Sequence, residues 1–255
     1  MSTPIRPAEA VLVIVDISGY TQFVHKRNVS LEHAEAIVTE LIESIIDQAE
    51  HPLVVNKLEG AAALLFAETR GERKLVVASA IRQVAQFLAV FARCLAHIRE
   101  SRRHCDCDAC ANIGVLQLKA FMHLGDIVIK KVRTFEEIAG DPVILVHRMT
   151  KNAVPLHEYV LLTEAIVEAG GSAIGGLQTL RETIDGLRTT LHWCPADAIA
   201  PFAGELPAPA RAGVAARGSY ERTLQFRNLP GVAVAHDRVQ GPGRLGRLLA
   251  RWWGR

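Results

Sequence analysis

The chain is predicted to fold as an α+β domain in which helices pack on a largely antiparallel sheet. Residues 30–49 and 74–99 repeat apolar side chains at three- and four-residue steps, as the buried face of a helix requires. Short β-branched runs lie between them, and two pairs of these runs have the spacing of hairpins. Because hairpins and helices are mixed rather than strictly alternating, a doubly wound parallel sheet is disfavoured.

The predicted elements follow from local signals along the chain. Residues 11–16 (VLVIVD) form a buried strand, and Ser30 caps the first long helix. A first hairpin is expected from 53–58 and 61–67 around Glu59-Gly60, and a second from 116–123 and 126–132 around Leu124-Gly125. The remaining predictions are a helix at 141–151, a strand at 159–163 and a last strand at 187–193, after the turn signal Asp185-Gly186.

Composition restricts the function classes. The chain is 49% hydrophobic and 22% charged, as in soluble globular proteins, which excludes a disordered chain. A net charge of +2 gives no bulk attraction to nucleic acid, so no nucleic-acid partner is predicted. The N-terminus lacks the apolar core of a signal peptide, and no apolar run approaches the roughly 18 residues of a membrane span. We therefore expect a cytoplasmic protein with a principal domain at 1–197, an Ala/Pro/Gly-rich linker at 198–218 and a C-terminal extension at 219–255.

A cysteine-rich loop predicts metal or thiol chemistry. Cys105, Cys107 and Cys110 have C-x-C-x-x-C spacing, and the total of five cysteines is odd. This is a poor disulfide framework, particularly in a reducing compartment. With His104 as a fourth ligand, the three thiolates would complete a tetrahedral zinc site. Two alternatives stay open at this point: a free, mobile cysteine loop and a redox-sensitive thiol pair.

Three segments, taken in order, resemble the motifs of class III nucleotide cyclases. Asp16 opens DISGYTQF, an aspartate at a strand end followed by a Gly-aromatic-Thr turn, and Lys57 opens KLEG, which resembles the K-x-x-G hairpin of that family. HLG at 123–125 and DPVILVHR at 141–148 resemble its second hairpin and the helix that carries its transition-state residues. The whole pattern, cysteine loop included, is similar to a bacterial family of unknown function related to those cyclases. The resemblance covers residues 8–195.

The resemblance implies a ferredoxin-like nucleotide cyclase fold for the principal domain and a site that uses two Mg or Mn ions held by two aspartates. Asp16 matches the first aspartate; the second should directly follow Gly60, where this chain has Ala61. By the same match, Lys57 and Glu137 correspond to residues that read the base, and Arg148 to the catalytic arginine that steadies the triphosphate. The position of the transition-state asparagine is occupied by Ile144, which cannot donate a hydrogen bond.

These matches lead to one main hypothesis and two alternatives. The main hypothesis is a degenerate, catalytically impaired cyclase-like domain with a nucleotide-binding or regulatory role, because loss of a metal ligand removes stabilisation of the transition state. The first alternative is an active nucleotide cyclase that recruits another carboxylate, with Glu59 and Asp126 as candidates. The second is a dimeric scaffold with a membrane- or partner-binding tail and no bound nucleotide. Since the sites of this family form between two protomers, the resemblance also implies a homodimer and a nucleoside triphosphate as ligand.

The C-terminal end predicts an amphipathic helix with a basic border. Its apolar residues recur on one helical face, and arginines flank that face: Leu245, Leu248, Leu249, Trp252 and Trp253, with Arg244, Arg247, Arg251 and Arg255. Arginine and tryptophan in this arrangement suit peripheral contact with an anionic membrane, here the inner membrane face. The alternative is that the apolar face docks on the protein's own body or on a partner.

Overall fold

The predicted α+β class is confirmed by a computed structural model of the chain, which describes residues 5–24, 30–184 and 187–204. In the described residues, eight strands form one sheet in the order β2-β3-β1-β4-β6-β8-β7, with β5 paired to β4. The pairs are antiparallel except for β4 and β6, which are parallel. The predicted turn at Asp185-Gly186 and the C-terminal amphipathic helix lie outside the described residues.

The strands are β1 (Ile5–Ser18), β2 (Val54–Glu59), β3 (Ala62–Glu68), β4 (Gln117–Val132), β5 (Phe135–Ala139), β6 (Tyr159–Thr163), β7 (Gln178–Ile184) and β8 (Leu187–Pro195). The helices are α1 (Tyr20–Val24), α2 (Leu31–Ile46), α3 (Arg73–Ser101), α4 (Asp108–Ala111), α5 (Asp141–Arg148), α6 (Glu164–Ala169) and α7 (Ala196–Ile199), with short 3-10 turns η1 (Ile113–Val115), η2 (Gly171–Ala173) and η3 (Ala200–Ala203).

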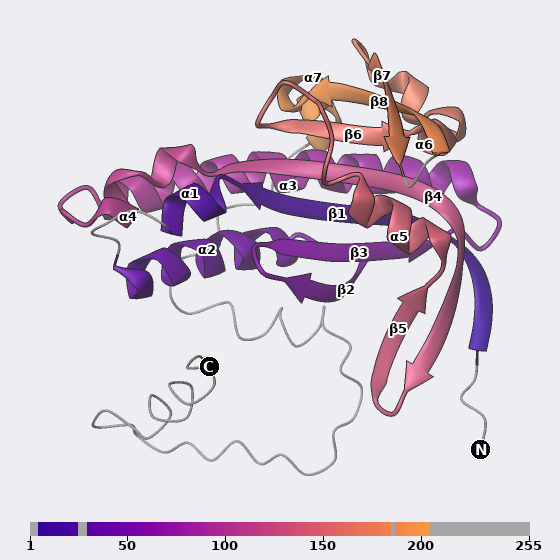
Figure 1. Cartoon of the computed structure of the whole chain (residues 1–255), viewed down its shortest axis with the longest axis horizontal. Helices are drawn as coiled ribbons and strands as arrows, with labels where there is room; N and C mark the ends of the chain where they lie inside the picture. The colour runs from indigo at the N-terminus through magenta and orange to yellow at the C-terminus, as the bar shows by residue number, and fades with distance from the viewer. Residues whose placement is uncertain (1–4, 25–29, 185–186, 205–255) are drawn as a thin grey trace.

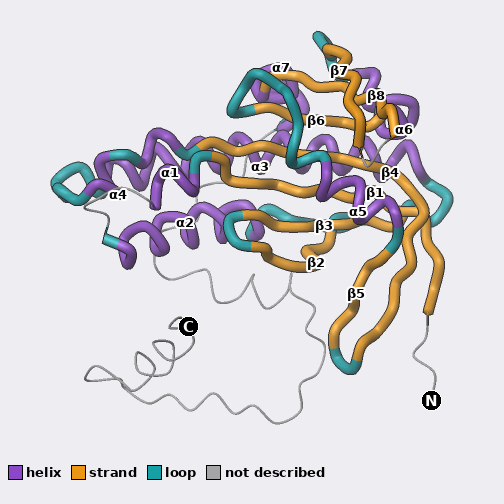
Figure 2. The backbone as a smooth tube through the Cα atoms, viewed as in Figure 1, coloured by secondary structure: helices purple, strands orange, loops and turns teal. Residues whose placement is uncertain are grey.

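Strand β1 is the centre of the sheet. It pairs with β3 on one edge and with β4 on the other, and its residues 10–15 are fully or almost fully buried. Val11, Val13 and Val15 face a core that contains α2 and α3, whereas Leu12 and Ile14 face a second core that contains α5. We refer to these two sides of the sheet as the α3 face and the α5 face; Figures 1 and 2 show the helices on either side.

The two long amphipathic helices cover the α3 face as predicted. Ser30 caps α2, and its hydroxyl oxygen accepts a hydrogen bond from the backbone N–H of His33 at 3.3 Å. Helix α3 is long and apolar enough to cross a membrane, but 67% of its most apolar stretch is buried inside the protein. That degree of burial is typical of a core helix, whose apolar residues are covered by the sheet and by neighbouring helices.

The prediction of a second hairpin turn at Leu124-Gly125 is wrong. Residues 117–132 form the single strand β4, and Gly125 pairs with Ala10 in the middle of the β1–β4 ladder. The turn lies at residues 133–134 instead, where Arg133 has a positive φ of 58°. Gly125 is required for packing rather than for turning, because a Cβ there would lie 2.7 Å from the Pro142 ring at the start of α5. The β4–β5 hairpin, which we call the arm, projects from the body of the molecule (Figure 1).

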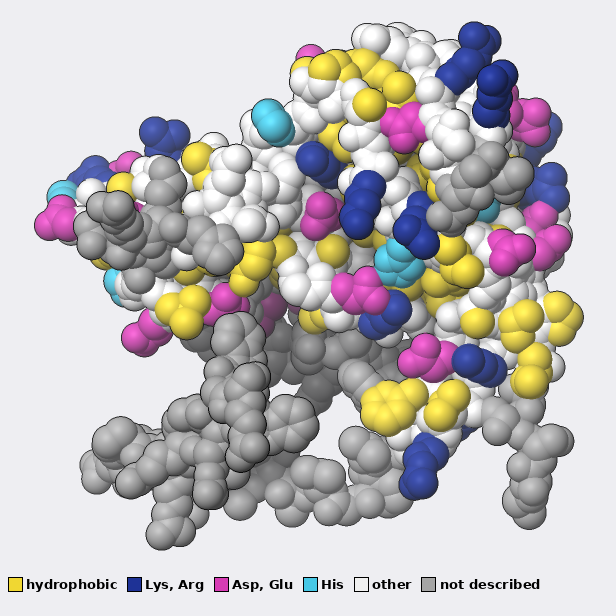
Figure 3. Space-filling view, viewed as in Figure 1, with side chains coloured by type: hydrophobic (Ala, Val, Ile, Leu, Met, Phe, Trp, Pro, Cys, Tyr) yellow, Lys and Arg dark blue, Asp and Glu magenta, His cyan; other side chains and the backbone are white. Residues whose placement is uncertain are grey.

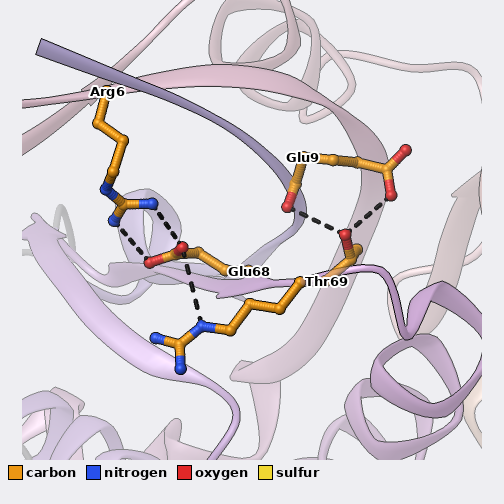
Figure 4. A network of polar contacts seen from close by, with 5 residues as sticks. Arg6, Glu9, Glu68 and Thr69 are labelled. Carbon is orange, nitrogen blue, oxygen red and sulfur yellow. Dashed lines mark hydrogen bonds and ion pairs between the residues drawn. The ribbon is translucent and has the colours of Figure 1, made fainter.

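Charged contacts join the N-terminal part of β1 to the C-terminal end of β3 and the residues after it (Figure 4). Arg6 makes two parallel hydrogen bonds to Glu68, at 2.6 and 2.9 Å. The hydroxyl of Thr69 donates to the Glu9 carboxylate at 2.9 Å (Figure 4). Arg73 also pairs with Glu9. Hydrogen bonds from Arg73 lower the pKa of Glu9, and those from Arg6 lower the pKa of Glu68. Both carboxylates are therefore stabilised in their ionised forms.

The structured body extends further than the predicted domain boundary at residue 197. The first residues of the expected linker form α7 and η3, and Ile199 and Ala203 are buried against the α3 face. Local composition did not show this, because alanine and proline are common both in linkers and in short helical turns. The rest of the linker and the C-terminal extension lie outside the described residues.

Replacing Gly125 by alanine tests the packing of β4 against α5. The added Cβ would lie 2.7 Å from the Pro142 ring and 3.0 Å from the His123 ring, so α5 must shift. We expect Gly125→Ala to lower the free energy of unfolding by about 1–3 kcal/mol, measured by chemical denaturation. Gly175→Ala is the control, since nothing lies within 4 Å of its added Cβ. Equal stability of the two variants would contradict this packing.

Candidate functional site

A row of four residues crosses the sheet and contains Asp16. Strand register places Glu59 opposite Ala62, Ala62 opposite Asp16, and Asp16 opposite Lys119. Residues directly opposite one another in antiparallel strands share a face, so all four lie on the α5 face. The row thus alternates acidic, small, acidic and basic residues over the strands β2, β3, β1 and β4.

Asp16 is partly buried and lies next to a cation. Burial raises the pKa of its carboxyl, and the charge of Lys119 acts in the opposite direction by favouring the ionised form. The Lys119 ammonium also lies 5.5 Å from the centre of the Tyr159 ring. Sequence reasoning missed Lys119. The available signal was a single charge inside the apolar stretch LKAFM at 118–122, in the strand that pairs with β1.

Ala61 lies on the opposite side of the sheet from Asp16. Gly60, with φ 61°, and Ala61 form the two-residue loop of the β2–β3 hairpin, which places the required positive φ on glycine. The Ala61 side chain is only 7% exposed and packs in the core of the α3 face, while its carbonyl accepts a hydrogen bond from Ile17 at 3.0 Å. In this conformation, a carboxylate at position 61 would point into apolar packing.

Lys57, Glu59 and His147 form a charged cluster that joins the hairpin to α5. The Lys57 ammonium lies 2.6 Å from one Glu59 oxygen, and Nδ1 of His147 lies 3.4 Å from the other. Figure 3, viewed from the α5 side, shows basic, acidic and histidine side chains together near the middle of this face. Lys57 was expected in the site from its motif. Glu59 lies two residues from Lys57 on β2, whereas His147 joins the cluster only because α5 packs beside the hairpin.

Glu137 and Arg148 are both exposed, and Glu137 is remote from Asp16 in the same chain. Glu137 lies on the arm opposite Lys130, whereas Asp16 lies opposite Lys119. The two lysines are eleven residues apart on β4, which corresponds to about 36 Å of extended strand. A site that uses both Glu137 and Asp16 therefore requires two protomers. Arg148 ends α5 next to His147, and Ile144, on the same helix, is 52% exposed.

The two carboxylates considered as replacements for the missing aspartate differ in position. Asp126 lies opposite Glu9 in the β1–β4 register, and Glu9 is seven residues from Asp16 along β1. About 23 Å of strand therefore separates Asp126 from Asp16. It cannot share a metal ion with Asp16 in one chain. Glu59 lies in the same row as Asp16, with only Ala62 between them. Around Asp16, one carboxylate beside a lysine does not by itself fit two divalent ions.

The cysteine loop forms a second cluster, far from the row along the chain. Cys105, Cys107 and Cys110 gather around Nδ1 of His33, in the first turn of α2. His104, the predicted fourth member, is not part of the group: it is exposed, and its Nε2 accepts a hydrogen bond from the Arg103 side chain at 3.0 Å. The loop after α3 folds back so that the thiols, and not His104, meet α2.

The thiols of this cluster differ in acidity. Burial opposes ionisation of Cys107, but hydrogen bonds from the Cys110 backbone N–H, His33 and Cys105 lower its pKa to about 6. Burial and the neighbouring thiols raise the pKa of Cys110 to about 12. His33, Cys105, Cys107 and Cys110 are together able to supply one nitrogen and three sulfur ligands to a metal ion.

Sequence comparison finds a family and a relative whose functions are not known. Residues 38–159 match a family model described as a protein of unknown function (DUF2652). An uncharacterized protein of Mycobacterium tuberculosis, Rv2561/Rv2562, is 33% identical over 158 residues, which cover 61% of this chain and 72% of that protein.

Solved structures similar to this chain are class III cyclase domains. The adenylyl cyclase CyaB of P. aeruginosa has a TM-score of 0.58 at 11% identity, covering 74% of this chain and 95% of that one. The guanylyl cyclase Cya2 has a TM-score of 0.55 at 15% identity, covering 76% and 92%. A class III adenylyl cyclase-like ATP-binding protein from Pseudomonas aeruginosa has a TM-score of 0.53 at 14% identity, covering 67% of this chain but 36% of that one. The expected nucleotide cyclase fold is thereby confirmed.

The partial burial of Asp16 predicts a pH-dependent effect of Asp16→Asn. Because burial raises the pKa of Asp16 above 3.8, the folded state binds its proton more tightly than the unfolded state does. The stability that this protonation contributes is present below pH 3.8 and lost as the pH rises through the raised pKa. Asp16→Asn should therefore be more stable than wild type at neutral pH, with a gain that disappears in acid, as measured by thermal unfolding.

The control for this experiment is Asp126→Asn, on an exposed carboxylate of the same sheet. We expect no comparable gain there, since its carboxylate remains in water in both states. A loss of stability in Asp16→Asn at neutral pH would contradict the view that burying the ionised Asp16 carboxylate destabilises the folded state.

Proposed function

This chain belongs to the family of unknown function that the DUF2652 model and the mycobacterial relative represent. We propose that it is a degenerate class III cyclase domain that binds a nucleoside triphosphate without efficient turnover. The observation that carries this proposal is the position of Lys119 beside Asp16. A lysine ammonium next to the aspartate that matches the metal ligand repels divalent cations, and its charge favours the ionised carboxylate that would otherwise attract them.

Two further features support impaired turnover, and two basic residues support retained nucleotide binding. Ala61 supplies no metal ligand, and its side chain lies in the core of the α3 face. Ile144 supplies no side-chain hydrogen-bond donor where transition-state charge would develop. Lys57 and Arg148 nevertheless retain positive charge on the α5 side, which attracts phosphate oxygens. The Pseudomonas cyclase-like protein of the same fold is described as ATP-binding, which makes ATP the first ligand to test.

We place the nucleotide between two copies of the chain. Asp16 and Glu137 are too far apart in one protomer, so the base-reading and metal-binding sides would come from different protomers. Apolar side chains are exposed on β2, the arm and α5: Leu58 on β2, Val132 and Phe135 on the arm, and Ile144 on α5. A protruding hairpin with exposed apolar residues favours contact with a second protomer, because burying this surface releases water.

A second candidate function is favoured by the position of Glu59. It lies in the same row and on the same face as Asp16, with the small Ala62 between them, so a metal ion bridging both carboxylates would make the domain an active cyclase. Against this, Glu59 is already paired with Lys57 and His147. Recruitment of Glu59 would require breaking those contacts.

Nucleotide binding and turnover separate these candidates. Full-length protein is titrated with each of the four ribonucleoside triphosphates and Mn²⁺ by calorimetry, and the same mixtures are searched for cyclic nucleotides by chromatography. We expect saturable binding without product. Arg148→Ala should weaken binding by about 10–100-fold, the loss expected for hydrogen bonds to a charged group. Arg82→Ala, on α3 at the other face of the sheet, should leave binding unchanged.

The outcomes exclude one another. Product from the wild type that disappears in Glu59→Gln would replace the proposal by the active cyclase with a recruited carboxylate. Absence of saturable binding of any of the four nucleotides would reject a nucleotide function and favour the scaffold hypothesis.

A substitution on the arm tests the proposed dimer. Phe135 is 56% exposed near the tip of the β4–β5 hairpin, so Phe135→Glu places a charge in the expected interface without disturbing the core. We expect a loss of dimer affinity of at least about tenfold, measured by analytical ultracentrifugation. Leu75→Glu is the matched control, because Leu75 is similarly exposed but lies on α3. A monomeric wild type, or equal effects of both variants, would rule out this interface.

A further inference from the structure

The cluster of one histidine and three cysteines has the geometry of a metal site. Nδ1 of His33 lies 3.4 Å from the sulfur of Cys105, 3.4 Å from that of Cys107 and 3.7 Å from that of Cys110. The sulfurs of Cys105 and Cys107 are 3.6 Å apart, and all four atoms lie within 4.8 Å of one another. Four potential ligand atoms thus surround one point.

These distances fit zinc. A tetrahedral ion with Zn–S bonds of about 2.3 Å and a Zn–N bond of about 2.0–2.1 Å separates neighbouring sulfurs by about 3.8 Å and sulfur from nitrogen by about 3.5 Å. The three sulfur–nitrogen distances and the Cys105–Cys107 sulfur–sulfur distance agree with those values to within about 0.2 Å. The four atoms are too close together to enclose a cluster of several irons, so a single ion is the better occupant.

We propose that His33, Cys105, Cys107 and Cys110 bind one zinc ion in a closed, structural site. All four tetrahedral positions are filled by protein ligands, which leaves none for water or substrate. This site is separate from the nucleotide site and does not depend on the function proposed for it.

The surrounding structure positions the ligands before the ion arrives. Ser30 caps α2 and fixes the turn that presents His33. Cys107 caps α4, and its sulfur accepts a hydrogen bond from the backbone N–H of Cys110 at 3.5 Å. Such N–H···S contacts stabilise metal-bound thiolates and orient them. Coordination by Nδ1 leaves Nε2 of His33 as the protonated nitrogen of the ring.

The ion would join segments that are distant in the chain. His33 and Cys105 are 72 residues apart, so the site ties the start of α2 to the loop that follows α3. That loop continues through η1 to Val115, whose carbonyl leaves no room for a Cβ on Gly19. Gly19 lies in the turn that follows Asp16. Zinc would therefore support the backbone just after β1, at the end of the strand that carries Asp16.

Metal content of the full-length protein tests the proposal. Protein produced in zinc-supplemented medium is analysed for zinc, iron and copper by mass spectrometry, and we expect one zinc ion per chain. His33→Ala should weaken zinc binding by at least about tenfold, whereas His104→Ala should retain the ion. Cys107→Ser should also lose zinc, and Cys94→Ser, at a cysteine outside the cluster, should not.

A rescue variant distinguishes ligation from misfolding. His33→Cys supplies a fourth thiolate and should restore zinc content, because four cysteines also make a tetrahedral site. Cobalt exchanged into the wild type should give the visible absorption of a tetrahedral thiolate complex. The proposal is overturned by wild-type protein that holds no metal or holds iron or copper, by a disulfide between Cys105 and Cys107 in freshly prepared protein, or by zinc that survives His33→Ala but not His104→Ala.

Discussion

The double pairing of β1 is the constraint on which the rest of the structure depends. A strand with neighbours on both edges and cores on both faces has its backbone hydrogen bonds satisfied and its side chains sorted by strict alternation. Its register assigns every partner on β3 and β4 to one face or the other. Asp16 is held at the end of this strand, partly removed from water, because the register allows it no other position.

On the proposed function, that position explains how a cyclase-like site loses turnover without losing its shape. Asp16 keeps its strand, but its opposite neighbours are Ala62 and Lys119, so local charge is balanced inside the protein. In the proposed domain, Lys119 balances part of the negative charge of Asp16 that a metal ion would otherwise balance. Lys57 and His147 hold Glu59 in the same way. In the proposed domain, such a surface of paired charges would attract phosphate but would not provide the concentrated positive field that phosphoryl chemistry requires.

The two proposed sites lie in different parts of the molecule. The charged row and α5 lie on one face of the sheet, the arm extends from it at the far end of β4, and the histidine–cysteine cluster lies where α2 begins and α3 ends (Figure 1). Gly19 and Val115 connect the cluster to the turn after Asp16. Small residues at this turn and at Gly125 allow backbone segments to approach closely, which transmits the position of one element to the next.

The sequence by itself determined the helices α2 and α3, the β2–β3 hairpin, the mixed class of the fold and the absence of a carboxylate at position 61, because periodicity, capping and turn chemistry are local. Tertiary structure alone decided that Gly125 lies inside a strand, that Lys119 faces Asp16 and that His33 rather than His104 meets the cysteines. Each of these depends on strand register or on contact between segments many residues apart. No local pattern specifies which of two histidines a folded loop will reach, since that choice is made by the packing of α2 against the end of α3.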